Sequence, residues 1–211
     1  LYKSGVKWVS HINKIKKLPS IFIANEFFDS IAIKQFRKSK NLWFEKFVDL
    51  SDQKNAFFFE KKINIKNIEK KIKFEISKNQ NFIEYSELGL DYLKKISKIV
   101  KKNNGGLLLI DYGYSDKKMK NTLQGISNHK FANILKNIGN IDITHHLNFE
   151  FFKKIIIQIG GLESNLTSQK EFLLKMGIKQ RAEIISQNQN FTKKADIYYR
   201  LNRLIDEKQM G

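Results

Sequence analysis

An apolar run that leads directly into polar residues constrains the fold more than any other stretch of this sequence. Residues 21–24 are all apolar and are followed at once by Asn25 and Glu26. Such a run predicts a buried strand whose carboxyl end places polar groups at the rim of a sheet. Open α/β sheets bind their ligands at that rim. We therefore expect the chemistry of this chain to lie near Asn25 and Glu26.

Two carboxylates follow this strand at a spacing of three residues, Glu26 and Asp29. If the chain turns helical after Asn25, both side chains project from one face of the helix. The same spacing fits an ordinary helix start, where acidic side chains are favourable near the amino end. The spacing alone leaves a functional carboxylate pair and a stabilised helix start as alternatives.

A second strand of the same kind follows a predicted helix. Ser86 is the expected N-cap of this helix, which continues to Asn103 with one apolar stripe. The next apolar run ends at Asp111, Tyr112 and Gly113. A helix followed directly by such a strand is typical of parallel α/β sheets. We therefore expect both strands in one sheet, with their polar ends at the same edge.

The rest of the pattern predicts a β-hairpin early in the chain and helices late. Residues 33–37 and 42–50 form two expected strands joined by residues 38–41, and residues 56–60 form a third. Residues 61–81 have weak periodicity and are expected to be loop and short turns. Helices are expected at residues 148–159, from the capping box at Ser168 to Gly177, at residues 179–187 and at residues 193–206.

Charge and composition exclude some classes of function. The net charge of +18 is a feature of nucleic-acid binding proteins, yet only four of the 39 basic residues are Arg. Specific recognition of phosphates and bases relies on Arg, so we expect a solvated lysine-rich surface and no specific nucleic acid, with an anionic partner as the alternative. The absence of cysteine excludes disulfides and Cys-based metal sites. No apolar run is long enough for membrane insertion.

His145 and His146 are adjacent, which suggests a metal site. A zinc hydrolase helix, however, spaces its two histidines at i and i+4 with a Glu between them. The pattern therefore predicts no metal and gives the two histidines polar or core-edge roles. Residues 115–140, which precede them, show no strong periodicity.

Four groups of residues, in order along almost the whole chain, resemble one protein family. They are residues 25–29 with Gln35 and Phe36; residues 109–114; residues 142–144 with His146 and Phe149; and Gln169 with residues 171–174 and 176–178. With these motifs the chain resembles the MidA-like S-adenosylmethionine-dependent methyltransferases, which include the mitochondrial complex I assembly factor that methylates an arginine of a complex I subunit. The chain departs from the family's Leu-Pro at Ile31 and Ala32.

The resemblance implies an α/β fold: a partial Rossmann-like class I methyltransferase sheet with helical and β-hairpin insertions. The strand ending at Asn25 would be the fourth strand of the family's seven-stranded sheet and the strand ending at Tyr112 the fifth. By the resemblance, the cofactor's glycine-rich loop would lie upstream of Leu1 and the family's last strand beyond Gly211. No Gly-x-Gly-x-Gly occurs in the chain. Residues 1–211 would form a single truncated domain, with core sheet elements at 18–32 and 84–114, substrate-side insertions at 33–83 and 115–150, and a helical part at 151–211.

The resemblance also implies a function: methyl transfer from S-adenosyl-L-methionine to a protein substrate, at an arginine of a respiratory complex I subunit. A non-catalytic assembly or scaffold protein of the same fold is the alternative. This chain alone would be inactive, and its location would be the cytoplasm of a bacterium, which we favour, or the mitochondrial matrix of a eukaryote. The implied site residues are Glu26 and Asp29 as catalytic; Asn25, Glu26 and Phe27 as cofactor-binding; and Asp111, Tyr112, Gly113, Thr144 and His146 on the substrate side.

Overall fold

A computed structural model describes residues 5–15, 18–128, 130–136 and 138–211. The chain forms two compact units, Leu1–Ser164 and Asn165–Gly211. The expectation of one truncated domain with the boundaries given above stays a prediction, and its first four residues lie outside the described part. None of the helices in the described part is both long and apolar enough to cross a membrane.

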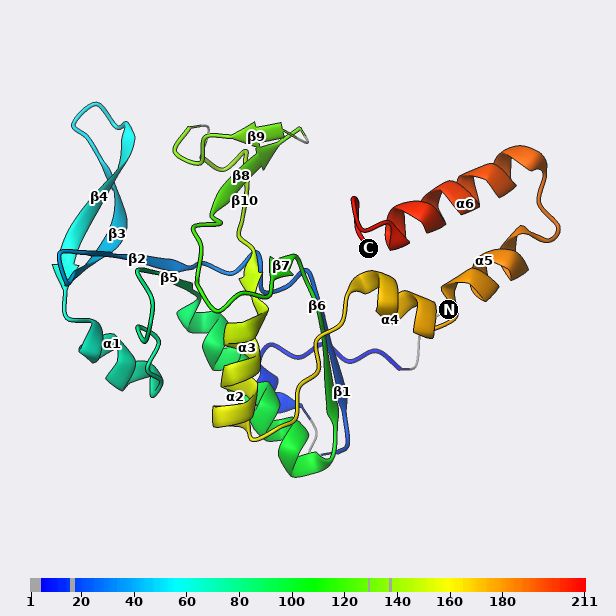
Figure 1. The fold of residues 1–211 in the computed structure, drawn as a ribbon, viewed down its shortest axis with the longest axis horizontal. Coiled ribbons are helices and arrows are strands. Elements are labelled where there is room, and N and C mark those ends of the chain that lie inside the picture. The colour runs from blue at the N-terminus through cyan, green and yellow to red at the C-terminus, as the bar shows by residue number, and fades with distance from the viewer. Residues whose placement is uncertain (1–4, 16–17, 129, 137) are drawn as a thin grey trace. The chain divides into compact units, whose positions relative to one another are not determined.

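A pair of parallel strands in the larger unit carries the predicted sheet edge (Figure 1). Strand β1 (Ile21–Asn25) pairs in parallel with β6 (Gly106–Ile110), and Asn25 lies opposite Ile110. Helix α2 (Glu87–Asn103) precedes β6 and begins at Ser86, whose Oγ accepts the Gly89 N–H at 2.9 Å. The predicted helix and the predicted parallel pair are therefore confirmed, and the polar ends of both strands share one edge. The expected burial of the first strand is wrong, because Ile21 is 78 % and Ile23 69 % exposed. The two-stranded sheet leaves that face of β1 uncovered among the described residues.

Two helices and the turn after β1 build the core beside this pair. Helix α3 (Phe149–Ile155) begins at Asn148, whose Oδ1 accepts the Phe151 N–H, and continues as the π-helix η2 (Ile156–Gly160). Phe28, in the turn after β1, is 1 % exposed and packs edge-on against Phe152 of α3. The turn that carries the predicted site is therefore fixed to the core by a fully buried ring.

An antiparallel sheet with the strand order β4-β3-β2-β5 lies on one side of the larger unit (Figure 1). Its first three strands, β2 (Lys34–Ser39), β3 (Leu42–Leu50) and β4 (Ala56–Ile63), confirm the predicted strands. Lys40 and Asn41 join β2 to β3 with φ values of 46° and 64°. Positive φ at both central residues is typical of the two-residue hairpin turn that matches strand twist.

The prediction of loop for residues 61–81 is wrong. The segment contains the end of β4 and helix α1 (Ile65–Ile72), which begins at Asn64. Ile65 and Ile72 are buried and Ile68 packs against the core, so the apolar residues of α1 do follow a helical spacing. The short stripe was missed because it lies among many lysines and asparagines. Strand β5 (Phe82–Tyr85) was also not predicted, and it forms by pairing with β2, which is distant in sequence.

Short strands complete the larger unit. Strands β7 (Gly113–Tyr114) and β11 (Leu147–Asn148) pair in parallel, and a Cβ atom at Gly113 would lie 2.4 Å from the Leu147 carbonyl oxygen. Only glycine permits that approach. Residues 115–140, where no regular pattern was found in the sequence, contain two strands of an antiparallel sheet. Its strands, in the order β10-β8-β9, are β8 (Gln124–Ser127), β9 (Lys130–Ala132) and β10 (Asp142–Thr144).

The smaller unit contains three helices, which confirm those predicted for it. They are α4 (Gln169–Lys175), α5 (Ile178–Ser186) and α6 (Phe191–Ile205). The Ser168 hydroxyl accepts the Glu171 N–H at 3.1 Å, which is the first half of the predicted capping box. Gly177 separates α4 from α5 in the left-handed conformation, with φ of 79°.

Candidate functional site

The chain does not turn helical after Asn25. Glu26 adopts a left-handed φ of 45°, and its N–H donates to the Ile110 carbonyl at 2.9 Å, which extends the β1–β6 ladder. The left-handed residue redirects the chain into a turn, so Glu26 is exposed while Asp29 is 7 % exposed. The expectation that both carboxylates project from one helical face is therefore wrong.

Asp111, predicted on the substrate side, holds this turn. One oxygen of its carboxylate accepts the N–H groups of Phe28 and Asp29 at 3.1 and 3.3 Å, and the other accepts the Tyr112 N–H at 2.9 Å. Burial, and then the negative charge of Asp29, raise the pKa of Asp111 to about 6. Asp111, at the end of β6, thus holds the turn after β1 by its hydrogen bonds. Burial and the nearby Asp29 make the charged form of its carboxylate unfavourable.

The exposed rim of the site contains the residues predicted to face the cofactor. Asn25, Glu26 and Phe27 follow one another at the end of β1, and all three are exposed. Partial burial, followed by the charge of Glu26 and a hydrogen bond to it, raises the pKa of the Tyr112 hydroxyl. The end of β1 and the end of β6 therefore meet through Glu26 and Tyr112, as the sequence predicted for one sheet edge.

The predicted residues Thr144 and His146 flank a buried histidine. The Thr144 hydroxyl accepts a hydrogen bond from Gln124 at 3.3 Å, and His146 is exposed. His145, between them, is 7 % exposed, and its N–H donates to the Asp29 carbonyl at 3.1 Å. Burial lowers the pKa of His145, and the charges of Glu84 and Asp29 oppose this effect. The structure therefore connects the turn after β1 to the segment after β10.

Glu84 of β5 is a polar residue of this region that was not singled out from the sequence. It is 7 % exposed, and it accepts hydrogen bonds from Gln35 Nε2 at 2.5 Å and from the backbone and hydroxyl of Thr122. The negative charges of Glu84 and of Asp29 both raise the pKa of His145, against the larger effect of burial. An acid inside the otherwise apolar and aromatic run of residues 82–85 was the available signal.

Four carboxylates of this region, those of Glu26, Asp29, Glu84 and Asp111, have no basic partner among the described residues. The ion pairs found there, within 4.0 Å, all involve other acids. Asp29 Oδ1 is buried without a hydrogen-bond partner. In a chain with 39 basic and 21 acidic residues, this region is locally anionic and suits a cationic group that donates hydrogen bonds. No group of three or more His, Cys, Asp or Glu that suits a metal ion occurs in the described part.

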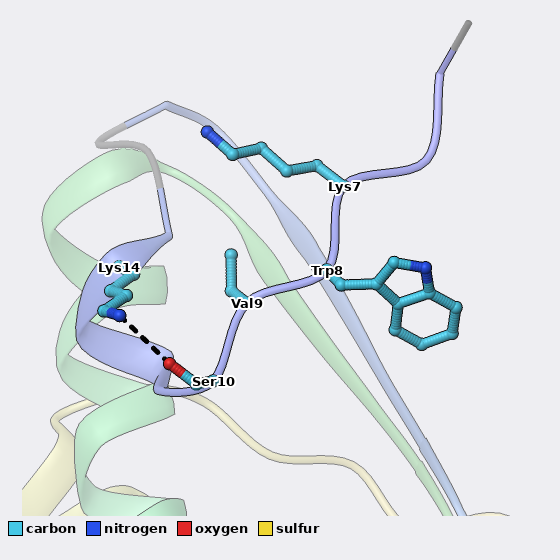
Figure 2. Close-up of a pocket in the computed structure, with 5 residues that line it drawn as sticks. All are labelled: Lys7, Trp8, Val9, Ser10 and Lys14. Carbon is cyan, nitrogen blue, oxygen red and sulfur yellow. Dashed lines mark hydrogen bonds between the residues drawn. The ribbon is translucent and has the colours of Figure 1, made fainter. Parts of the chain in front are cut away.

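A hollow of about 490 Å³ lies elsewhere, on the segment that carries the short 3-10 helix η1 (Ile12–Lys14). Its lining residues are Lys7, Trp8, Val9, Ser10 and Lys14. Figure 2 shows Lys7 and Lys14 extending to one side and Trp8 to the other, where its ring is 92 % exposed. The lining contains two lysines and no acid, so its charge is opposite to that of the β1–β6 edge.

Comparison with known proteins identifies relatives over most of the chain. Residues 2–167 match the family described as "Putative S-adenosyl-L-methionine-dependent methyltransferase". A Danio rerio protein named protein arginine methyltransferase NDUFAF7, mitochondrial, is 24 % identical, and the match covers 100 % of this chain and 51 % of that protein. The Caenorhabditis elegans homolog of that name is 27 % identical over 84 % of this chain and 42 % of its own length. The chain thus spans about half the length of these curated relatives.

Solved structures share the fold. A COG1565 superfamily member from Burkholderia thailandensis, bound to S-adenosyl-homocysteine, superposes with a TM-score of 0.72 at 20 % identity. The superposition covers 97 % of this chain and 54 % of that protein. A second structure of a COG1565 superfamily protein from the same organism gives a TM-score of 0.71. The α/β fold predicted from the sequence is therefore confirmed.

Proposed function

This chain belongs to the family of putative S-adenosyl-L-methionine-dependent methyltransferases, and on that premise we propose that it contributes the acceptor side of a protein arginine methyltransferase site. The observation that carries the proposal is the exposed Glu26 carboxylate at the carboxyl end of β1, in a cluster of acids without a basic partner among the described residues. A guanidinium has the charge and the donors that this cluster lacks. The names of the curated relatives support the same substrate class.

Glu26 has the central role in this proposal. Its carboxylate binds the guanidinium of the substrate through two parallel charge-assisted hydrogen bonds and orients one nitrogen for attack. The left-handed backbone of Glu26 and the hydrogen bonds of the turn to Asp111 hold that carboxylate at the sheet edge. Methylation of a guanidinium nitrogen releases one proton, and the Glu26 carboxylate is the group that receives it. Asp29 adds negative charge behind the bound cation.

S-adenosylmethionine supplies a methyl group already activated by a sulfonium. Asn25, Glu26 and Phe27 form the part of this chain that faces it in our proposal, since carboxylates and exposed rings suit a sulfonium cation. The 211 residues contain no Gly-x-Gly-x-Gly loop, so the chain alone is expected to bind the cofactor poorly or not at all. Micromolar binding of S-adenosylmethionine to the 211-residue chain in a calorimetric titration would contradict this expectation.

The finer identity of the substrate follows from the family resemblance, and we propose an arginine of a respiratory complex I subunit. The relatives named above are mitochondrial, so the expected cytoplasmic location stays a prediction without support from them. The non-catalytic scaffold is the second possibility, because an acidic surface at the same edge also binds an arginine without methylating it.

The experiment that tests the proposal measures transfer of a tritiated methyl group to purified complex I subunits by the full natural polypeptide that contains these residues. Glu26→Gln keeps the shape of the side chain and removes its charge, and we expect transfer to fall about 100-fold. Glu60→Gln is the matched control, because Glu60 pairs with Arg37 on the antiparallel sheet and should leave transfer unchanged. Absence of S-adenosylmethionine binding by the full polypeptide refutes the enzyme, and a Glu26→Gln variant that keeps its partner but loses methylation excludes the scaffold.

A further inference from the structure

Glu84 lies where three separate parts of the chain meet. It belongs to β5, and its register partner in β2 is Gln35, whose Nε2 donates to it at 2.5 Å. The same Gln35 Nε2 donates to Asn121 Oδ1 at 2.8 Å, in the segment that precedes β8. Gln35 is 4 % exposed and Glu84 is 7 % exposed, so this contact is shielded from water. A hydrogen bond to a buried charge is among the stronger polar contacts in proteins.

Thr122 connects Glu84 to the histidine segment. The Thr122 N–H donates to the Glu84 carboxylate at 3.3 Å, and its hydroxyl also donates to that carboxylate. The hydroxyl proton has two acceptors within reach, the Glu84 carboxylate and the His146 carbonyl at 3.3 Å, and the nearer, charged acceptor binds it more strongly. The lone pairs of the same oxygen accept the His146 N–H at 2.9 Å. The orientation of the Thr122 hydroxyl, and with it the position of the His146 backbone, is therefore set by Glu84.

The histidine segment in turn contacts the turn after β1. The N–H of His145 donates to the Asp29 carbonyl at 3.1 Å. Two consecutive N–H groups therefore donate to different segments: that of His145 to the Asp29 carbonyl and that of His146 to the Thr122 hydroxyl. Asp29 is held on its other side by Asp111, and its Oδ1 is buried without a hydrogen-bond partner. A shift of the histidine segment would therefore disturb the hydrogen bond that holds the Asp29 carbonyl.

We infer that Glu84 is a positioning residue of the acceptor site: through Thr122 and the backbone of residues 145–146 it fixes Asp29, whose charge lies behind the guanidinium of a bound arginine. This inference rests on the proposed function. Glu84 itself is occupied by Gln35 and Thr122 and does not touch the substrate. Its negative charge also contributes to the preference of the site for a cation.

Two variants and one rescue test this inference in the 211-residue chain. Glu84→Gln places an amide among donors, so Thr122 loses a charged acceptor. We expect the amide protons of Thr122 and His146 to exchange with solvent about tenfold faster, while the Glu26 amide on the β1–β6 ladder exchanges as before. Thr122→Val leaves Glu84 in place but removes the hydroxyl that accepts the His146 N–H. The His146 amide proton should therefore exchange faster by a similar factor. Adding Gln35→Glu to Glu84→Gln restores a donor–acceptor pair and should restore much of the protection.

Binding of a cationic probe separates positioning from a merely structural role. The probe is acetyl-Gly-Arg-Gly-amide, titrated while the amide signals of Asp29 and Tyr112 are followed by NMR well below the melting temperature of each variant. Glu84→Gln and Thr122→Val should weaken its binding about tenfold, and Glu60→Gln, an exposed acid of β4, should leave it unchanged. The same peptide with Gln in place of Arg should not bind.

The inference is wrong if Glu84→Gln leaves the exchange of Thr122 and His146 unchanged. It is equally wrong if exchange accelerates but the affinity for the arginine peptide stays at the wild-type value, or if the wild-type chain does not bind the peptide. Peptide binding that depends on Glu84, together with a full polypeptide that transfers no methyl group, would refute the proposed enzyme activity and leave the positioning role intact.

Discussion

Replacement of Asp111 by Asn should change how the stability of the chain depends on pH. The carboxylate of Asp111 is partly buried beside Asp29, and its pKa is raised from 3.8 to about 6. Between these values the folded state holds the proton more tightly than the unfolded state does. Stability contributed by Asp111 is therefore present at low pH and is lost as the pH rises through this window.

The magnitude follows from the same values. For a fully buried group, a pKa raised from 3.8 to about 6 corresponds to about 3 kcal/mol of unfavourable ionisation in the folded state. Asp111 is only partly buried, and screening by solvent reduces this to about 1 to 1.5 kcal/mol. Asn resembles the protonated acid but accepts the N–H groups of Phe28 and Asp29 or that of Tyr112, so it also loses about 1 kcal/mol at every pH.

Urea unfolding at pH values from 4 to 7 measures this effect in the difference between wild type and Asp111→Asn, which cancels the other titrating groups. We expect the free energy of unfolding of wild type relative to the variant to fall by about 1 to 1.5 kcal/mol from pH 4 to pH 7, with equal m-values. Glu60→Gln gives a control of opposite sign, because the hydrogen bond from Arg37 lowers the pKa of Glu60. A flat or rising difference for Asp111→Asn would refute the reasoning.

Three further predictions concern the scaffold. Gly113→Ala should cost about 2 kcal/mol in thermal or urea unfolding because its Cβ would meet the backbone of β11 at 2.4 Å, whereas Gly106→Ala, with no atom within 4 Å of its Cβ, should cost less than half of that. Leu93→Ala should lower stability by about 3 kcal/mol because Leu93 is 0 % exposed, and Leu88→Ala, at a position 52 % exposed, should change it little; equal losses would contradict the packing. Ser86→Ala should lower the free energy of unfolding by about 1 kcal/mol and Ser86→Asn almost not at all, because Asn also caps helices. Thermal unfolding followed by circular dichroism measures both, and equal losses would contradict the role of the cap.

The sequence was sufficient for elements that neighbouring residues specify. The strand before Asn25 was predicted from an uninterrupted apolar run, and the helix after Ser86 from a cap and a stripe, and both lie where they were expected. Strand β5 was not predicted because four residues with an acid among them become a strand only by pairing with β2, whose sequence is distant. Pairing partners of that kind are not encoded in local periodicity.

The meeting of the candidate residues at one sheet edge was predicted, but their contacts were not, and their roles stay predictions. Asn25, Glu26, Asp111 and Tyr112 do meet at the carboxyl ends of two parallel strands. The local rule nevertheless predicted a helical turn there, because a left-handed conformation is uncommon for Glu and nothing in the residue type announces it. Residue type likewise gave no sign that Asp111 uses both of its oxygens to hold the turn.

Two features of this edge support the proposal that it binds a cationic substrate. A left-handed Glu costs free energy that the fold must supply, and such strain is concentrated at functional sites. Burial, and then the negative charge of Asp29, raise the pKa of Asp111, so these two carboxylates repel one another. A bound guanidinium would relieve that repulsion and lower the pKa of Asp111. An arginine peptide that binds this edge should therefore reduce the pH dependence described above, whereas a peptide bound elsewhere should leave it unchanged.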